Sequence, residues 1–142
     1  MKICAHKGLV IVVLTRNEHC PPHVHTGTNE WNARFEFSFW HDGVRLWDVT
    51  PAKNQPSARL LEEVRQTIKQ PRHLRKARES WWNAMQSVCL INQCWDATAG
   101  EAVAMRDRRA GVPAIQSAHF DASKNQTVLR LTDQPDAVEI NL

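Results

Sequence analysis

The sequence feature that most constrains the fold is a strictly alternating stretch between residues 31 and 39. Every second position is apolar: Trp31, Ala33, Phe35, Phe37 and Phe39. The positions between them carry polar side chains: Asn32, Arg34, Glu36 and Ser38. Successive side chains of a strand point to opposite faces of its sheet, so the pattern predicts a strand with one buried and one polar face. Such strands are typical of antiparallel sheets that are covered on one side.

Further strands are predicted around this stretch. The apolar, β-branched run Leu9–Leu14 predicts a buried central strand. Residues 23–26 predict a short strand. His41-Asp42-Gly43 is typical of a tight turn in which Asp-Gly supplies a positive φ, so residues 44–49 should run back antiparallel.

Helices are predicted in the middle of the chain. Ser57 is a good N-cap, and a helical apolar stripe follows it at Leu60, Leu61, Val64 and Ile68. Pro71 interrupts this stripe, and a second helix follows with Leu74, Ala77, Trp81, Met85 and Val88 on one face. Thr98-Ala99-Gly100-Glu101 matches a capping box, which predicts a short third helix from about Ala99 to Ala110.

The C-terminal part reads as a small β-meander with strands at residues 114–120, 127–131 and 137–142. The fold class predicted is therefore α+β, an antiparallel sheet with two or three helices packed on one side and a small C-terminal β-meander. We expect residues 1–96 to form the main domain. Residues 97–142 should add the short helix and the meander, packed on the first part.

Composition excludes several classes of protein. The net charge of +3 over 142 residues is too weak by itself to indicate nucleic-acid binding, and six Trp favour a protein with a partner. The run Leu9–Leu14 is too short to span a membrane and no small-residue cleavage site follows it. The four cysteines lack zinc-ribbon spacing. We expect free thiols and a cytoplasmic protein.

The segment His19-Cys20-Pro21-Pro22-His23-Val24-His25 is the candidate site. Its two prolines predict a stiff elbow, beyond which His23 and His25 leave the same face of an extended chain. From the residues alone we favour a structural role, in which the imidazoles hydrogen-bond neighbouring backbone. The alternatives are a divalent metal such as zinc, bound by His19, His23 and His25, and acid–base chemistry or RNA contact.

The second helix carries a basic run. Four of its cations form the candidate nucleic-acid-binding set: Arg72, Arg75, Lys76 and Arg78. Basic side chains with nearby aromatic rings, here Trp81 and Trp82, can bind phosphates and stack on bases. The alternative is an ordinary solvated helix face, because Glu62, Glu63 and Glu79 lie close in sequence.

Taken in order, these elements resemble a family of small bacterial domains of unknown function catalogued as DUF four-one-six-zero. Its signature is an apolar strand, a His-x-Pro-Pro-His-x-His turn, an alternating strand and two Trp-containing helices. The matching residues are Leu9–Leu14, His19–His25, Trp31–Phe39 and Ser57–Val88. Cys20 departs from the Asn or Glu expected there. The resemblance implies a toxin–antitoxin-type pair, and the tail from Val112 to Leu142 resembles the β-rich start of the partner family, DUF two-four-four-two.

Three hypotheses of function follow. The first is a toxin–antitoxin-associated protein of unknown activity that binds nucleic acid, a partner protein or a second copy of itself. The second is a metal-dependent hydrolase or nuclease built on the histidine cluster. The third is a non-catalytic interaction module, such as an inhibitor from a mobile element. The sequence identifies no catalytic residue and does not decide whether the protein is an enzyme.

Overall fold

The computed structural model describes residues 1–142 and divides them into two compact units, Met1–Gln86 and Ser87–Leu142. Residues 87–96, which we assigned to the first part from the sequence, belong to the second unit. The predicted α+β class is confirmed, because antiparallel sheets are combined with two α-helices and a C-terminal meander. None of the helices combines the length and the apolar character that a membrane span requires.

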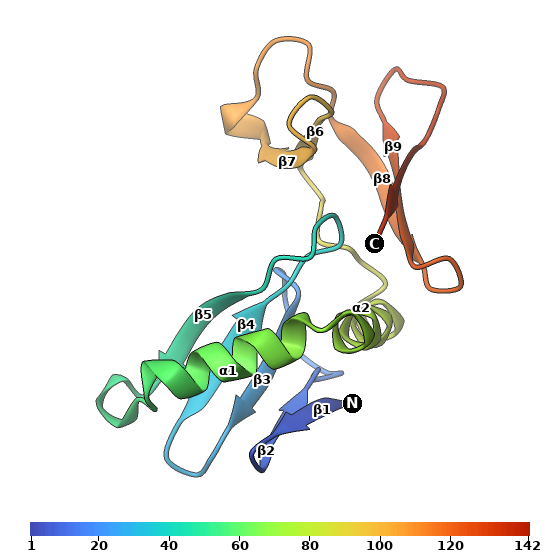
Figure 1. Cartoon of the computed structure of the whole chain (residues 1–142). Coiled ribbons are helices and arrows are strands. Elements are labelled where there is room, and N and C mark those ends of the chain that lie inside the picture. The colour runs from blue at the N-terminus through green and yellow to red at the C-terminus, as the bar shows by residue number, and fades with distance from the viewer. The chain divides into compact units, whose positions relative to one another are not determined.

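The N-terminal unit is built on a five-stranded antiparallel sheet whose strands follow one another in sequence order (Figure 1). The strands are β1 (Lys2–His6), β2 (Leu9–Val12), β3 (His23–Gly27), β4 (Asn32–Glu36) and β5 (Arg45–Thr50). The predicted alternation is confirmed, since all five apolar residues from Trp31 to Phe39 are buried.

The run Leu9–Leu14 is a strand, but it is not the buried central one that we predicted. Its β2 portion lies second from the sheet edge, beside β1, which the sequence did not predict. Ile11 and Val13 are fully buried, whereas Val10 and Leu14 are 46% and 42% exposed. An unbroken apolar run hides this alternation because both faces carry the same residue types.

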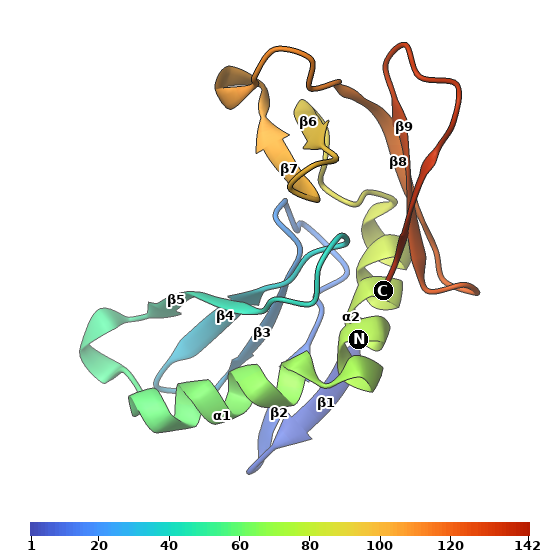
Figure 2. The ribbon, with the colours of Figure 1, turned by 45° about the horizontal axis from the view of Figure 1, so that its top comes forward.

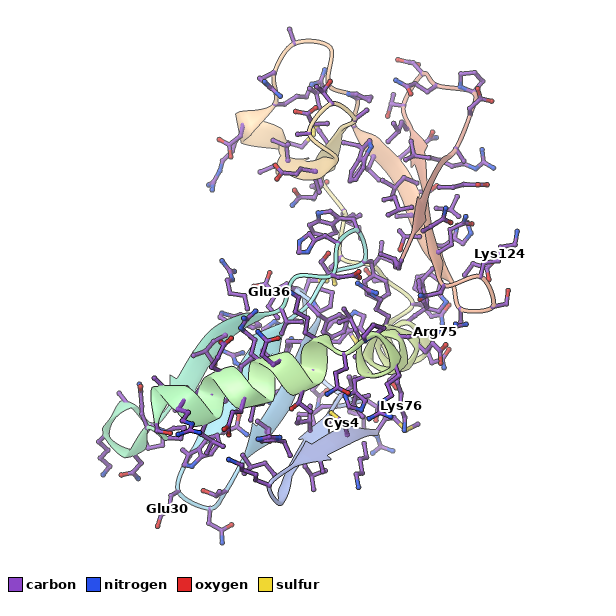
Figure 3. The ribbon with its side chains drawn as sticks, viewed as in Figure 1. Cys4, Glu30, Glu36, Arg75, Lys76 and Lys124 are labelled. Carbon is purple, nitrogen blue, oxygen red and sulfur yellow. The ribbon has the colours of Figure 1, made fainter.

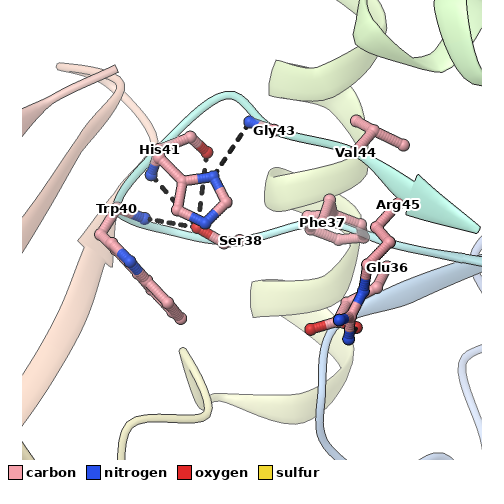
Figure 4. Close-up of a pocket in the computed structure, with 8 residues that line it drawn as sticks. All are labelled: Glu36, Phe37, Ser38, Trp40, His41, Gly43, Val44 and Arg45. Carbon is pink, nitrogen blue, oxygen red and sulfur yellow. Dashed lines mark hydrogen bonds and ion pairs between the residues drawn. The ribbon is translucent and has the colours of Figure 1, made fainter. Parts of the chain in front are cut away.

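The link between β4 and β5 is wider than the predicted Asp-Gly turn. The strands pair antiparallel as expected, with Glu36 opposite Arg45. Between them the Ser38 hydroxyl accepts hydrogen bonds from the backbone N–H groups of Trp40 and His41, and Gly43 N–H donates to His41 Nδ1 (Figure 4). Gly43 does not have a positive φ. Side chains therefore shape this loop in place of a strained glycine.

Two helices cover one face of the sheet (Figures 1 and 2). After a short 3₁₀ turn, η1 (Ala52–Asn54), α1 (Ala58–Lys69) begins where the Ser57 side chain accepts a hydrogen bond from Leu60 N–H at 3.1 Å. The second helix, α2 (Pro71–Met85), has Pro71 in its first turn. Both helices contact β1, and α1 also contacts β5.

The C-terminal unit contains the predicted meander. Its strands are β8 (Ile115–Asp121), β9 (Gln126–Leu131) and β10 (Val138–Asn141), paired in the order β10-β9-β8. A separate hairpin joins β6 (Gln93–Asp96) to β7 (Glu101–Ala104) and leads into a 3₁₀ turn, η2 (Met105–Asp107).

The predicted third helix from Ala99 to Ala110 is wrong. The carboxylate of Asp96 accepts hydrogen bonds from the N–H groups of Thr98 and Ala99, both at 3.1 Å, and Gly100 takes a φ of +65°. These contacts close a tight turn between β6 and β7. The backbone N–H groups at this point are therefore bonded within a hairpin and do not begin a helix.

The cysteines are not all free thiols, as we had expected. Cys4 and Cys94 are free and buried, whereas neither Cys20 nor Cys89 is a free thiol. The expectation failed because the spacing of cysteines in a sequence carries no information about their oxidation state.

Candidate metal centre

The site is centred on β3, where His25 lies on the face of the sheet opposite the buried core residues and His23 also contacts Trp81 of α2. Register places His25 of β3 opposite Arg34 of β4, and Arg34 opposite Asp48 of β5. Directly opposed residues of antiparallel strands share a face, so these three side chains form one row. Their neighbours Val24 and Phe35, which point to the other face, are fully buried. The alternation of β4 thus creates both the core and the polar surface that holds the site.

Glu18 reaches this face from the loop between β2 and β3. One carboxylate oxygen, Oε2, lies 2.5 Å from His23 Nε2, and the other, Oε1, lies 3.3 Å from His25 Nε2. The Glu18 side chain is only 9% exposed. A carboxylate with so little solvent needs positive charge or hydrogen-bond donors nearby.

The His23 ring has a fixed proton arrangement. Its Nδ1–H donates to the Pro21 carbonyl at 2.8 Å, because a carbonyl oxygen can only accept. A neutral ring with its hydrogen on Nδ1 directs the lone pair of Nε2 at the Glu18 carboxylate. Burial lowers the pKa of His23, although the Pro21 carbonyl and Glu18 act in the opposite direction. A contact this short between Nε2 and a carboxylate oxygen is stabilised by a positive charge, either a proton on Nε2 or a cation bound between the two atoms.

His25 is less constrained than His23. Its side chain is 17% exposed, and its buried Nε2 atom has no hydrogen-bond partner despite lying near Glu18. His25 also lines an open cavity of about 380 Å³, together with Val12, Thr26 and Asn32. The His25 ring therefore borders accessible space, while its Nε2 atom, which faces Glu18, is buried.

Together Glu18, His23 and His25 can hold a metal ion. One ligand atom from each residue lies within 4.8 Å of the others. Two imidazoles and one carboxylate bind zinc and other borderline divalent ions at about 2.0–2.2 Å. Ligands at the tetrahedral angle around such an ion would be about 3.4 Å apart. Binding would thus require Glu18 Oε2 and His23 Nε2 to separate by about 1 Å from their present 2.5 Å.

The predicted ligand set is corrected at one position. His19 is exposed, its Nδ1–H donates to the Cys20 carbonyl at 3.2 Å, and it is not part of the cluster. Glu18 takes its place. The signal in the sequence was a carboxylate next to the histidine motif, since divalent ions often combine imidazole with carboxylate. The structural role that we favoured is also supported, because His19 and His23 both bond the elbow's backbone.

Aromatic rings and an ion pair surround the cluster. The Trp47 ring meets the His23 ring edge-on at 5.1 Å, and the Trp81 ring lies 5.3 Å from it. Arg34 lies over Trp47, 4.0 Å from the ring centre, and its Nε–H donates to Asp48 Oδ1 at 2.8 Å. A second contact joins Arg34 Nη2 to Asp48 Oδ2. This pairing lowers the pKa of Asp48 and raises that of Arg34.

The structure separates the four predicted nucleic-acid-binding residues. Arg72 and Lys76 are exposed on α2, and Arg75 pairs with Glu79 at 3.1 Å. Arg78 is 2% exposed, so its proposed contact with nucleic acid is wrong. Its guanidinium donates to the carbonyls of Ser38 and His41, both at 2.8 Å, and to Asp42 at 2.9 Å. Arg78 therefore fastens α2 to the β4–β5 loop.

Lys2, which was not among the predicted residues, lies near the exposed Arg72 and Lys76. Lys2 of β1, Arg72 and Lys76 all act electrostatically on the Cys4 thiol, whose pKa is nevertheless raised by burial. Figure 3 shows Lys76 and Cys4 near each other beside α2. Lys2, Arg72 and Lys76 form no ion pair and together make up the basic face.

No family model, curated protein or solved structure matches the chain. The resemblance to DUF four-one-six-zero therefore stays a prediction.

Proposed function

We propose that the N-terminal unit is a divalent-metal-dependent hydrolase whose ion is held by Glu18, His23 and His25. The observation that carries the proposal is the convergence of one carboxylate and two imidazoles within 4.8 Å. Zinc suits this donor set, as do other borderline divalent ions. When bound, such an ion supplies Lewis-acid activation of water or of a substrate oxygen.

The charges around the cluster favour a cation. With neutral histidines, Glu18 and Asp48 each contribute one negative charge and Arg34 contributes one positive charge. Together these three charged groups have a net negative charge, and a divalent ion would make the total positive. Partial burial strengthens this attraction because little solvent screens it.

The number of ligands favours catalysis over a structural metal. Structural zinc sites are closed by four protein ligands, whereas catalytic sites use three and leave a position open. Here three ligands converge, and His25 faces an open cavity. Substrate would approach from this side, while Trp47 and Trp81 pack against the buried His23 ring and restrict water there.

Each protein residue has a separate task. The Pro21 carbonyl fixes the proton of His23 on Nδ1 and so keeps Nε2 available, as backbone carbonyls commonly do for histidine ligands. Glu18 supplies negative charge from a loop that can adjust to the ion. His25 supplies the ligand closest to the open cavity.

The test is the metal content of the untagged protein after incubation with zinc and removal of excess ion. We expect about one zinc per chain in the wild type, and loss of zinc in Glu18→Gln and His25→Gln. His19→Ala is the matched control, because His19 belongs to the same motif but lies outside the cluster. Circular dichroism checks folding, and hydrolysis of chromogenic carboxylate and phosphate esters is measured on the same samples.

Two results would overturn the proposal. The first is equal zinc content in the wild type and in folded Glu18→Gln and His25→Gln. The second is a zinc-loaded protein that hydrolyses neither ester class faster than these two variants do. Loss of zinc in His19→Ala would mean that the site is the histidine set predicted from the sequence.

A second candidate function is nucleic-acid binding by the basic face. The N-terminal unit contains 13 Lys and Arg against 8 Asp and Glu, a net charge of +5. Lys2, Arg72 and Lys76 add unpaired charge at one place on this unit. Lys and Arg side chains without an ion-pair partner can bind phosphates and release counterions from the nucleic acid. Side chains that already pair with a carboxylate contribute less, because their charge is neutralised.

The salt dependence of binding to a single-stranded oligonucleotide tests this second function. Replacing Lys2, Arg72 and Lys76 together by Gln should weaken binding and reduce the slope of log K against log salt by about 2. Arg59→Gln serves as control, because Arg59 is exposed but lies 3.6 Å from Glu63. An unchanged slope in the triple variant would exclude the basic face as the binding surface.

A further inference from the structure

We propose that the substrate of the metal centre is a phosphate ester and that Arg34 binds one of its nonbridging oxygens. This inference rests on the proposed metal-dependent hydrolase and adds the class of substrate. It follows from the position of Arg34, from the donors that its partners leave free, and from the charge of the loaded site.

Arg34 occupies the position beside a proposed metal ligand. It is paired directly with His25 across β3 and β4, so both side chains leave the same face of the sheet from adjacent strands. A group bound near His25 would therefore lie within reach of the guanidinium.

The orientation of Arg34 leaves donors available. Its stacking on Trp47 fixes the guanidinium plane, and Asp48 takes the Nε–H and one Nη2–H. Of the five N–H donors of an arginine, this leaves the Nη1 pair and one Nη2–H without an acceptor within the protein. The side chain is 26% exposed. A fixed, partly exposed guanidinium with free N–H groups is suited to an oxyanion.

The charge of the site favours phosphate over a neutral ester. The set of Glu18, Arg34 and Asp48 becomes net positive once a divalent ion is bound, and the whole N-terminal unit has a net charge of +5 from 13 basic and 8 acidic residues. A phosphate ester has at least two nonbridging oxygens. One can approach the metal while another accepts a hydrogen bond from Arg34. A neutral carboxylic ester gains nothing from this second contact.

The reaction balances with water alone. The water oxygen forms a bond to phosphorus, and the P–O bond to the leaving alcohol breaks. One proton of the water ends on the leaving oxygen, and the other remains on the phosphate product. Arg34 would stabilise the charge on the nonbridging oxygens throughout.

Binding of inorganic phosphate to the zinc-loaded protein, measured by calorimetry, tests the inference without any turnover. We expect phosphate to bind the wild type, and Arg34→Gln to weaken it by at least about tenfold with unchanged zinc content. The double variant Arg34→Gln, Asp48→Asn should show the same loss, because it removes the guanidinium without leaving a lone carboxylate. Arg45→Gln is the control, since Arg45 pairs with Glu36 in the next row and is 77% exposed.

The outcomes separate the two proposals. Absence of zinc binding overturns the proposed function itself. Zinc binding without phosphate binding, or phosphate binding that is unchanged in the folded double variant, overturns only the role of Arg34 and the phosphate class. Acetate binding as tight as that of phosphate would indicate a carboxylate ligand and would also contradict the inference.

Discussion

Replacing Arg78 by Met should destabilise the N-terminal unit strongly. The guanidinium is buried and donates to the Ser38 carbonyl, so its loss leaves one buried acceptor unsatisfied, which costs about 1–3 kcal/mol. The His41 carbonyl keeps a long contact with the Ser38 hydroxyl at 3.4 Å, and losing its better donor costs about 1 kcal/mol. Asp42 is 65% exposed, so water can solvate its carboxylate after the ion pair is lost, and this adds little to the destabilisation. The expected loss is about 2–4 kcal/mol.

Urea unfolding followed by tryptophan fluorescence measures this loss. All tryptophans except Trp95 lie within residues 1–86, so the signal reports mainly on the N-terminal unit. Asp42→Asn removes only the exposed part of the network and should cost less than about 1 kcal/mol. Arg72→Met, on the same helix but exposed, should stay within about 0.5 kcal/mol of the wild type. An Arg78→Met protein as stable as Arg72→Met would refute the assigned anchoring role.

Two further predictions concern local structure. Ser57→Ala removes the side-chain acceptor at the start of α1 and should reduce the free energy of unfolding by about 1 kcal/mol, whereas Ser57→Asp should preserve it; equal losses in both would argue against capping. Hydrogen bonds from the Ala99 N–H, Arg109 and the Thr98 N–H lower the pKa of Asp96, so its stabilising effect is present above the unfolded pKa and is lost as pH falls through the lower folded one. In NMR titrations the amide shifts of Thr98 and Ala99 should change below pH 3.8 and stay flat in Asp96→Asn; a midpoint above 3.8 would contradict the hydrogen bonding.

Much of the fold could be predicted because period-two and helical patterns are local properties of the chain. The alternation from Trp31 to Phe39 predicted both the buried face and the polar face of β4. Ser57 and Pro71 marked the starts of both helices. The third helix could not be predicted correctly, since the Asp96 carboxylate competes for the same backbone N–H groups and its own position depends on a hairpin.

The site was predicted in location but not in composition. Strand geometry placed His23 and His25 on one face, but the contact with Glu18 depends on how the loop after β2 folds back, which no periodic pattern encodes. Arg78 shows a different kind of error. Arg78 lies four residues after Leu74 and three before Trp81, within the apolar stripe of α2. This spacing indicates a buried position, and the side chain is buried despite its charge.

The most direct test of the metal centre is anomalous diffraction at the zinc edge from crystals of the zinc-loaded protein. The structure predicts one peak about 2.0–2.2 Å from Glu18 Oε2, His23 Nε2 and His25 Nε2. His23 Nδ1 should still donate to the Pro21 carbonyl in the same crystals. A zinc-loaded crystal with no peak among these three atoms, or with its peak at His19, would contradict the account.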